Sequence, residues 1–132
     1  MQLTPEALKL DLPTTTTRMK RFIKDYIEKT RAEGIVLGLS GGIDSSTAAA
    51  ITSLAIGADN VLALSLPEQE THNPTDTKHI RQLAKKFRFH LKTIDITPII
   101  KAHTQSIPAF DPRDKLSKGN LKARIRMTII YY

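Results

Sequence analysis

Two adjacent glycines, an aspartate and several serines follow an apolar run in residues 36–46, VLGLSGGIDSS. Gly41 and Gly42 allow positive φ values and leave main-chain N–H groups uncovered by side chains. A helix that begins at about Ile43 adds unpaired N–H groups and the positive end of its dipole. Serine hydroxyls supply further donors, at Ser40, Ser45 and Ser46. Together these groups predict a phosphate-binding loop.

Asp44 is the member of this stretch that repels phosphate. A divalent cation placed between the carboxylate and a phosphate removes the repulsion, because Mg²⁺ takes oxygen ligands from both. We therefore predict that Asp44 is a magnesium ligand. The alternative is a plain turn in which Asp44 is only the first-turn acid of a helix. The loop has neither the lysine of the Walker motif nor the spacing of a GxGxxG loop, which excludes both of those nucleotide motifs.

The hydrophobic pattern predicts the elements that must position this loop. Residues 14–34 predict an N-terminal helix, and its apolar side chains recur at helical spacing: Met19, Phe22, Ile23, Tyr26 and Ile27. Residues 35–96 alternate short apolar runs with helical patterns, which predicts a βαβαβ core. A mobile loop is predicted over 107–120 and the start of a core helix over 121–132. The expected fold class is α/β, an open parallel sheet with helices on both faces.

Composition narrows the function classes. The 132 residues have room for one domain, and the absence of cysteine excludes a disulfide framework and cysteine catalysis. No apolar run reaches the ~18 residues of a membrane span, so we expect a cytoplasmic protein without a membrane partner. The net charge of +7 indicates either an anionic partner or a solvated basic surface. Basic residues gather toward the C-terminus: Arg113, Lys115, Lys118, Lys122, Arg124 and Arg126.

Three segments carry a resemblance to a known family. SGGIDSS at residues 40–46 resembles the SGGxDS loop of the ATP pyrophosphatase superfamily, which cleaves ATP between its α and β phosphates. GNLKARIRM at 119–127 resembles the GNxKARxRM segment of NAD synthetases, and LSLPEQET at 64–71 resembles the turn after that family's second strand. The chain thus resembles about the first half of an ammonia-dependent NAD synthetase domain. The fold implied is adenine nucleotide alpha hydrolase-like, a Rossmann-like three-layer sandwich, here apparently truncated.

The resemblance also implies roles for particular residues. Asp44 would bind Mg²⁺, and Leu64 and Leu66 would lie beside adenine. Arg124 and Asn120 would contact nicotinic acid adenine dinucleotide (deamido-NAD). The ATP phosphates would be held by the loop residues Gly38, Leu39, Ser40, Gly41, Gly42, Ile43, Asp44, Ser45 and Ser46.

The implied reaction is amidation of deamido-NAD to NAD in two steps. The nicotinate carboxylate attacks the α phosphate of ATP, which gives an adenylate and releases pyrophosphate, and ammonia then displaces AMP. No side-chain nucleophile is required, and the resemblance assigns no particular residue a catalytic role. Thirty-four residues precede the first strand and leave no room for the amidohydrolase domain of glutamine-fed relatives. Ammonia is therefore the expected nitrogen donor, either free or supplied by a separate subunit. A homodimer with the dinucleotide site between subunits is also implied.

The chain departs from the family pattern in two places. The later threonine for ATP and glutamate for magnesium do not occur in it, so the 132 residues alone are expected to be an inactive fragment. Glu68, Gln69 and Glu70 replace a small glycine-containing turn after Pro67. Two alternatives stay open: another adenylating ATP pyrophosphatase, of the GMP synthetase or tRNA-modifying kind, and a non-catalytic nucleotide- or RNA-binding module. Nucleic acid is the less favoured partner.

Overall fold

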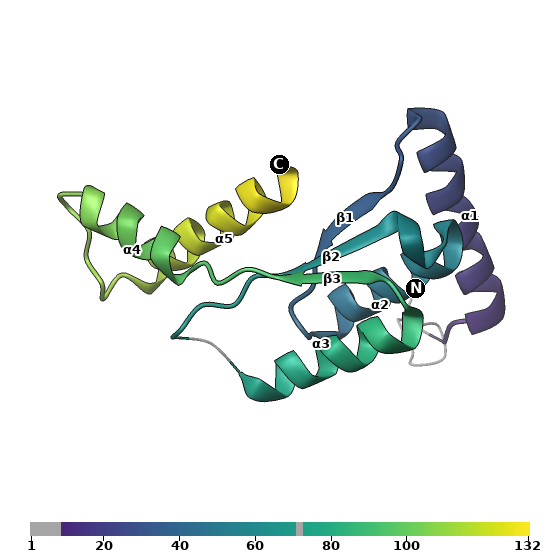
Figure 1. Ribbon diagram of the computed structural model, residues 1–132, viewed down its shortest axis with the longest axis horizontal. Helices are drawn as coiled ribbons and strands as arrows, with labels where there is room; N and C mark the ends of the chain where they lie inside the picture. The colour runs from purple at the N-terminus through teal and green to yellow at the C-terminus, as the bar shows by residue number, and fades with distance from the viewer. Residues whose placement is uncertain (1–8, 71–72) are drawn as a thin grey trace, which may run out of the picture.

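The computed structural model describes residues 9–70 and 73–132, so Thr71 of the LSLPEQET segment lies outside the described residues. Helices and short strands alternate along the chain (Figure 1). The elements are α1 (Leu12–Thr30), β1 (Ile35–Gly38), α2 (Ile43–Ile56), the 3₁₀ turn η2 (Ala58–Asn60), β2 (Val61–Ser65), α3 (Pro74–Phe87), β3 (His90–Thr93), α4 (Thr97–Ser106) and α5 (Lys115–Tyr131).

The three strands form one parallel sheet in the order β1-β2-β3, which confirms the predicted βαβαβ arrangement. On one side of the central strand β2, Ile35 pairs with Val61. On the other side, Leu62 pairs with His90. Because the strands are parallel, their carboxyl ends meet at one edge of the sheet, and the loop that follows β1 opens at that edge.

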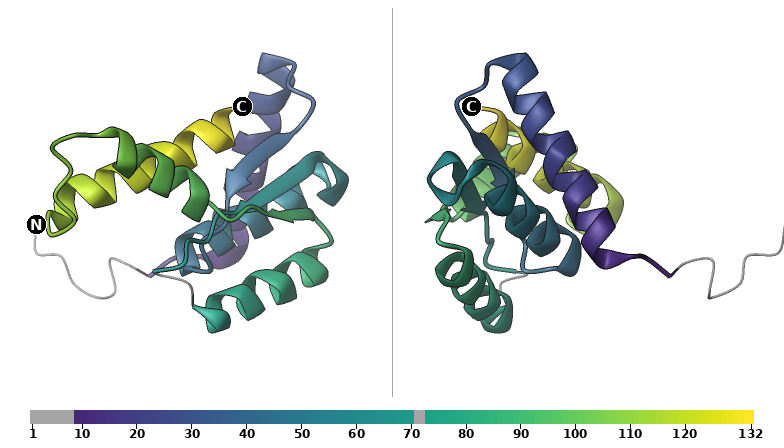
Figure 2. Two further views of the ribbon diagram at one scale, coloured as in Figure 1. Left: turned by 60° about the vertical axis from the view of Figure 1, so that its left-hand side comes forward. Right: turned by 90° about the vertical axis from the view of Figure 1, so that its right-hand side faces the viewer.

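Helices cover both faces of the sheet, as predicted. Successive side chains of a strand point to opposite faces. Val61 and Ala63 of β2 are buried in a core that also contains residues of α2 and α3. Leu62 and Leu64 belong to a second core, with residues of α4 and α5. Figures 1 and 2 show α2 and α3 on one side of the sheet and α5 on the other.

The last helix begins at Lys115, inside the segment predicted as a loop, so the predicted helix start at residue 121 is wrong. Asp114 caps the helix, since its carboxylate accepts the N–H groups of Leu116 and Ser117 at 3.1 Å each. The Ser117 hydroxyl also donates to the Asp114 carboxylate. Together, the hydroxyl and the backbone N–H of Ser117 hold the pKa of the Asp114 carboxyl below its ordinary value. Gly119, a weak helix former, lies within α5 and made its first turns look like a loop.

Helix α1 packs against α2 with only part of its predicted apolar face. Ile23 and Ile27 are half-buried, whereas Phe22 and Tyr26 are exposed and stack on each other with ring centroids 6.4 Å apart. The helix ends at Thr30, where Arg31 adopts a left-handed φ of 56°, rather than at Gly34. None of the helices within 9–70 and 73–132 combines the length and the apolar character needed to cross a bilayer.

Candidate functional site

The glycine loop leaves the sheet directly from paired backbone. β1 ends at Gly38, and the N–H of Leu39 still donates to Leu64 O of β2 at 2.9 Å. Ser40, Gly41 and Gly42 then connect to α2. The loop therefore sits at the carboxyl edge of the sheet, where open α/β sheets bind ligands.

One of the two glycines has the predicted left-handed backbone. Gly41 has φ +90°, and a Cβ atom placed there would come within 2.8 Å of the Cβ of Asp76 in α3. Gly42 has φ −73° and is the N-cap of α2, so the expectation of positive φ fails at this position. Gly41 is thus required both for the turn and for close packing against the first turn of α3.

Hydrogen bonds inside the loop engage some of the donors that we predicted for phosphate. The N–H of Gly42 donates to Ser40 Oγ at 3.2 Å, and the N–H of Ser40 donates to Ser45 Oγ at 3.2 Å. Ser45 Oγ in turn donates to Gly42 O at 3.2 Å. These bonds fix the shape of the loop. No side chain caps α2, so the backbone N–H groups of its first turn remain available to a ligand.

A pocket of about 510 Å³ opens beside the loop. Gly38, Leu39 and Ser40 form one part of its lining, at the end of β1. A second part comes from the neighbouring strand β2 and the residues after it, including Leu64 and Leu66. The first turns of α3 and the second half of α5 complete it, with Asn73, Asp76, Thr77, Ile80, Arg126 and Ile130. The structure therefore brings the first three of the predicted ATP-binding residues and the predicted adenine-side leucines to one cavity, whereas residues 41–46 do not line it.

Asp44 lies in the first turn of α2 with its side chain exposed. Its carboxylate makes no hydrogen bond or ion pair with any residue that the structure describes, so its oxygens can accept a cation. Within the same residues no three metal-binding side chains gather into a cage. This donor set fits Mg²⁺, which binds through one or two carboxylates together with substrate phosphates and water. Asp44 would hold the ion, and the ion would neutralise charge on the phosphates.

Arg124 and Asn120 lie apart from this pocket. Both are exposed residues of α5, and Arg124 Nη1 donates to Asn120 O of the same helix at 3.3 Å. Neither residue lines the pocket. Arg126, two positions further on, does line it, and its Nε donates to Leu66 O at 3.2 Å. The structure thus separates the two arginines of the KARIR segment.

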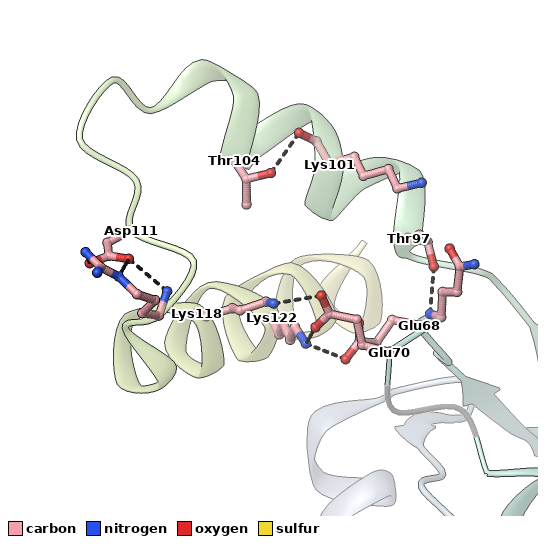
Figure 3. A network of polar contacts seen from close by, with 10 residues as sticks. Glu68, Glu70, Thr97, Lys101, Thr104, Asp111, Lys118 and Lys122 are labelled. Carbon is pink, nitrogen blue, oxygen red and sulfur yellow. Dashed lines mark hydrogen bonds and ion pairs between the residues drawn. The ribbon is translucent and has the colours of Figure 1, made fainter.

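An ion-pair network that the sequence did not reveal joins the segment after β2 to α5 (Figure 3). Lys122 Nζ contacts Glu68 Oε1 at 2.5 Å and Glu70 Oε2 at 3.0 Å. Lys118 Nζ contacts Glu70 Oε1 at 2.7 Å. Two of the basic residues that gather toward the C-terminus are therefore bound to carboxylates of the chain itself. The acids Glu68 and Glu70, two positions apart directly after a strand, were the available sequence signal.

The network shifts the ionisation of its members. Burial acts to lower the pKa of Lys122, but hydrogen bonds and charges from Glu68 and Glu70 outweigh it and hold that pKa above its ordinary value. Hydrogen bonds from Lys118 and then Lys122 hold the pKa of Glu70 below its ordinary value. Lys122 and Glu70 are therefore both charged at neutral pH, and the ion pair between them is intact there.

The fold and the loop define a class, that of parallel α/β proteins with a ligand pocket at the carboxyl edge of the sheet. The sequence profile of the NAD synthase family matches residues 15–132, which is most of the chain. The chain belongs to the NAD synthase family.

Sequence relatives carry the same family name. The chain is 37% identical over 123 residues to an NH(3)-dependent NAD(+) synthetase of Methanosarcina mazei, which covers 93% of this chain and 48% of that protein. It is 44% identical over 117 residues to an NH(3)-dependent NAD(+) synthetase of Methanocaldococcus jannaschii, and this match covers 87% of this chain and 44% of that protein. The chain thus spans about half the length of the curated relatives it matches.

Solved structures show the same relationship. The chain superposes on an NH3-dependent NAD synthetase from Campylobacter jejuni, in complex with the nitrate ion, with TM-score 0.84 and 32% identity, covering 93% of this chain and 52% of that one. It is also similar to an NMN synthetase from Francisella tularensis, with TM-score 0.83 and 30% identity. This match covers 93% of this chain and 50% of that one. The predicted α/β fold class and the predicted family are confirmed.

Proposed function

We propose that this chain contributes the ATP-binding half of an ammonia-dependent NAD synthetase. The observation that carries the proposal is the position of the SGGIDSS loop, which borders the 510 Å³ pocket in a chain of the NAD synthase family. ATP would lie in that pocket with its phosphates at the start of α2 and its base toward Leu64 and Leu66. Mg²⁺, ATP and ammonia are the other components of the proposed reaction, in the cytoplasm.

The loop residues would act by positioning and by neutralising charge. The nicotinate carboxylate attacks the α phosphorus of ATP and pyrophosphate leaves; ammonia then attacks the carbonyl carbon and AMP leaves with the C–O bond electrons. The free amides at the start of α2 would bind the phosphate oxygens, and Asp44 would hold Mg²⁺, which supplies positive charge when bound. Catalysis by orientation and electrostatic stabilisation requires no side-chain nucleophile.

Arg124 and Asn120 would bind deamido-NAD. Their exposure on α5 outside the ATP pocket supports a separate binding surface for the second substrate. A guanidinium group binds phosphate oxygens in a bidentate fashion, which suits the two phosphates of a dinucleotide. A homodimer would place this surface between subunits.

A second candidate reaction is formation of NMN. It is favoured by the similarity to the protein named NMN synthetase, which nearly equals that to the NAD synthetase in TM-score. The chemistry would be the same amidation, carried out on the smaller mononucleotide acid. The two reactions differ only in the size of the acid that binds beside ATP.

One experiment tests both reactions. The chain is incubated with ATP, Mg²⁺, ¹⁵N-labelled ammonia and either deamido-NAD or nicotinic acid mononucleotide, and the products are analysed by mass spectrometry. Labelled NAD with equal amounts of AMP and pyrophosphate would identify the first reaction, and labelled NMN as the faster product would identify the second. Because the chain spans half of its relatives' length, Mg²⁺-dependent ATP binding is measured in parallel and is the result expected of the chain alone. Salt-sensitive RNA binding without ATP binding would contradict the proposal.

A further inference from the structure

Four residues of α5 form a row along one face of the helix. Lys118, Lys122, Arg126 and Ile130 are spaced four positions apart, which places them above one another on the same side of a helix. The row follows the segment after β2. Lys118 contacts Glu70, Lys122 contacts both glutamates, and Arg126 contacts Leu66 O. At the far end, the Ile130 side chain packs where a Cβ atom of Gly38 would lie.

The first two cations of the row have their partners within the chain. Lys122 is 12% exposed at its side chain and Glu68 is 3% exposed, so this pair is largely shielded from water. The segment that carries the glutamates is itself fixed by α4, because the N–H of Gln69 donates to Thr97 Oγ1 at 2.9 Å (Figure 3). Lys118 and Lys122 therefore attach α5 to the border of the pocket and are not available to a ligand.

Arg126 differs from both lysines. It is half-buried, and no carboxylate within the described ranges forms an ion pair with it. A guanidinium has five N–H donors, and Arg126 uses its Nε–H to bond Leu66 O. A partly buried cation without a counter-ion is unfavourable unless an anion reaches it. Ser40 of the glycine loop lines the same pocket as Arg126.

We propose that Arg126 is an ATP-binding residue, whose remaining N–H groups bind a phosphate oxygen in the pocket that it shares with Ser40 of the glycine loop. The inference rests on the proposed function. The inference also gives different roles to two arginines that are close in the sequence. Arg126 binds ATP, while the exposed Arg124 binds the second substrate, deamido-NAD. The Glu68–Lys122 pair acts as a positioning contact, since it fixes α5 one turn before Arg126.

The test compares two ligands and three variants. Dissociation constants for Mg²⁺–ATP and for adenosine are measured by NMR titration on the wild-type chain and on Arg126→Gln, Arg126→Lys and Arg124→Gln. Arg126→Gln is expected to weaken ATP binding about 10- to 100-fold, the loss expected for a charge-assisted hydrogen bond, and to leave adenosine binding unchanged. Arg126→Lys should lose less, because it keeps the charge. Arg124→Gln, the matched control on the same helix, should bind ATP normally.

The ligand comparison separates a phosphate contact from a structural role. Equal losses for ATP and adenosine, or unchanged ATP affinity in Arg126→Gln, would overturn the inference while the proposed function stands. If Arg126→Gln does not fold, as judged by circular dichroism, the same comparison is made with Arg126→Lys. A wild-type chain that binds no ATP would overturn the proposed function and the inference together.

Discussion

Lys122 of α5 places its ammonium nitrogen 2.5 Å from Oε1 of Glu68, a residue 54 positions earlier in the chain. The two groups are shielded from water by α5 and by the segment after β2. A buried ion pair adds little over a matched apolar pair, but removing one partner leaves an uncompensated charge. The pair therefore fixes α5 against the segment after β2. Four predictions concern these contacts and the glycine loop.

Replacing Lys122 should destabilise the protein far more than replacing Lys118. Lys122→Met removes the ammonium group that pairs with the buried Glu68 carboxylate, and breaking such a buried ion pair costs about 3–5 kcal/mol in the free energy of unfolding. The partner of Lys118 is Glu70, whose side chain is 58% exposed, so Lys118→Met should cost less than about 1 kcal/mol. Urea unfolding followed by circular dichroism measures both. Equal losses would contradict the structural difference, and Glu68→Gln combined with Lys122→Met should recover part of the loss.

Glu70 should contribute to the acid sensitivity of the fold. Its carboxyl has a lower pKa in the folded chain than in the unfolded chain, because Lys118 and Lys122 bind the charged form. Its stabilisation is therefore present above the ordinary glutamate pKa of about 4.3 and is lost as the pH falls through the folded value. The unfolding free energy of Glu70→Gln should fall less steeply than that of the wild type below about pH 4.3. If the unfolding free energies of the wild type and of Glu70→Gln, measured by urea titration, fall equally steeply over this pH range, the result would contradict a stabilising role of these ion pairs.

Two glycines should respond to alanine in opposite directions. Gly41→Ala places a side chain at φ +90° and against Asp76, so it should lower stability by about 1–3 kcal/mol and weaken ATP binding. Gly119 lies within α5 with no atom near its would-be Cβ, so Gly119→Ala should stabilise by about 0.5–1 kcal/mol. Thermal unfolding and ATP titration on both variants check this. A stabilising Gly41→Ala would show that the loop geometry is different.

Asp44 should govern magnesium-dependent nucleotide binding. Asp44→Ala removes the carboxylate proposed to hold Mg²⁺, so ATP affinity measured by calorimetry should no longer increase when Mg²⁺ replaces EDTA. Asp59→Ala is the matched control, because Asp59 is an exposed first-turn acid of η2, on the far side of α2 from the loop. The magnesium proposal fails if Asp44→Ala keeps the full magnesium response.

The parallel sheet was predictable because its signals are local. Short apolar runs separated by helical patterns fix the βαβαβ order, and Gly57 and Pro67 lie within two residues of the observed ends of α2 and β2. The start of α5 was missed, since the weak helix formers Gly119 and Asn120 lie in its first turns, although Asp114 caps the helix.

The candidate site was predictable only in part. The loop between β1 and α2 has a local sequence motif, so its place at the carboxyl edge followed from strand order. Contacts across the pocket depend instead on how α5 crosses the sheet. The pairing of Glu68 with Lys122 and the separation of Arg126 from Arg124 are set by that crossing, which no local pattern encodes.

The regular spacing of Lys118, Lys122, Arg126 and Ile130 makes α5 more sensitive to its length than to its composition. Each residue of an α-helix turns by about 100°, so a single amino acid inserted between Lys122 and Arg126 would rotate everything after it away from the cavity. The two lysine contacts would persist while the guanidinium and Ile130 left their places. Within this stretch of α5, evolution is free to vary the outward-facing positions but not to add or delete one.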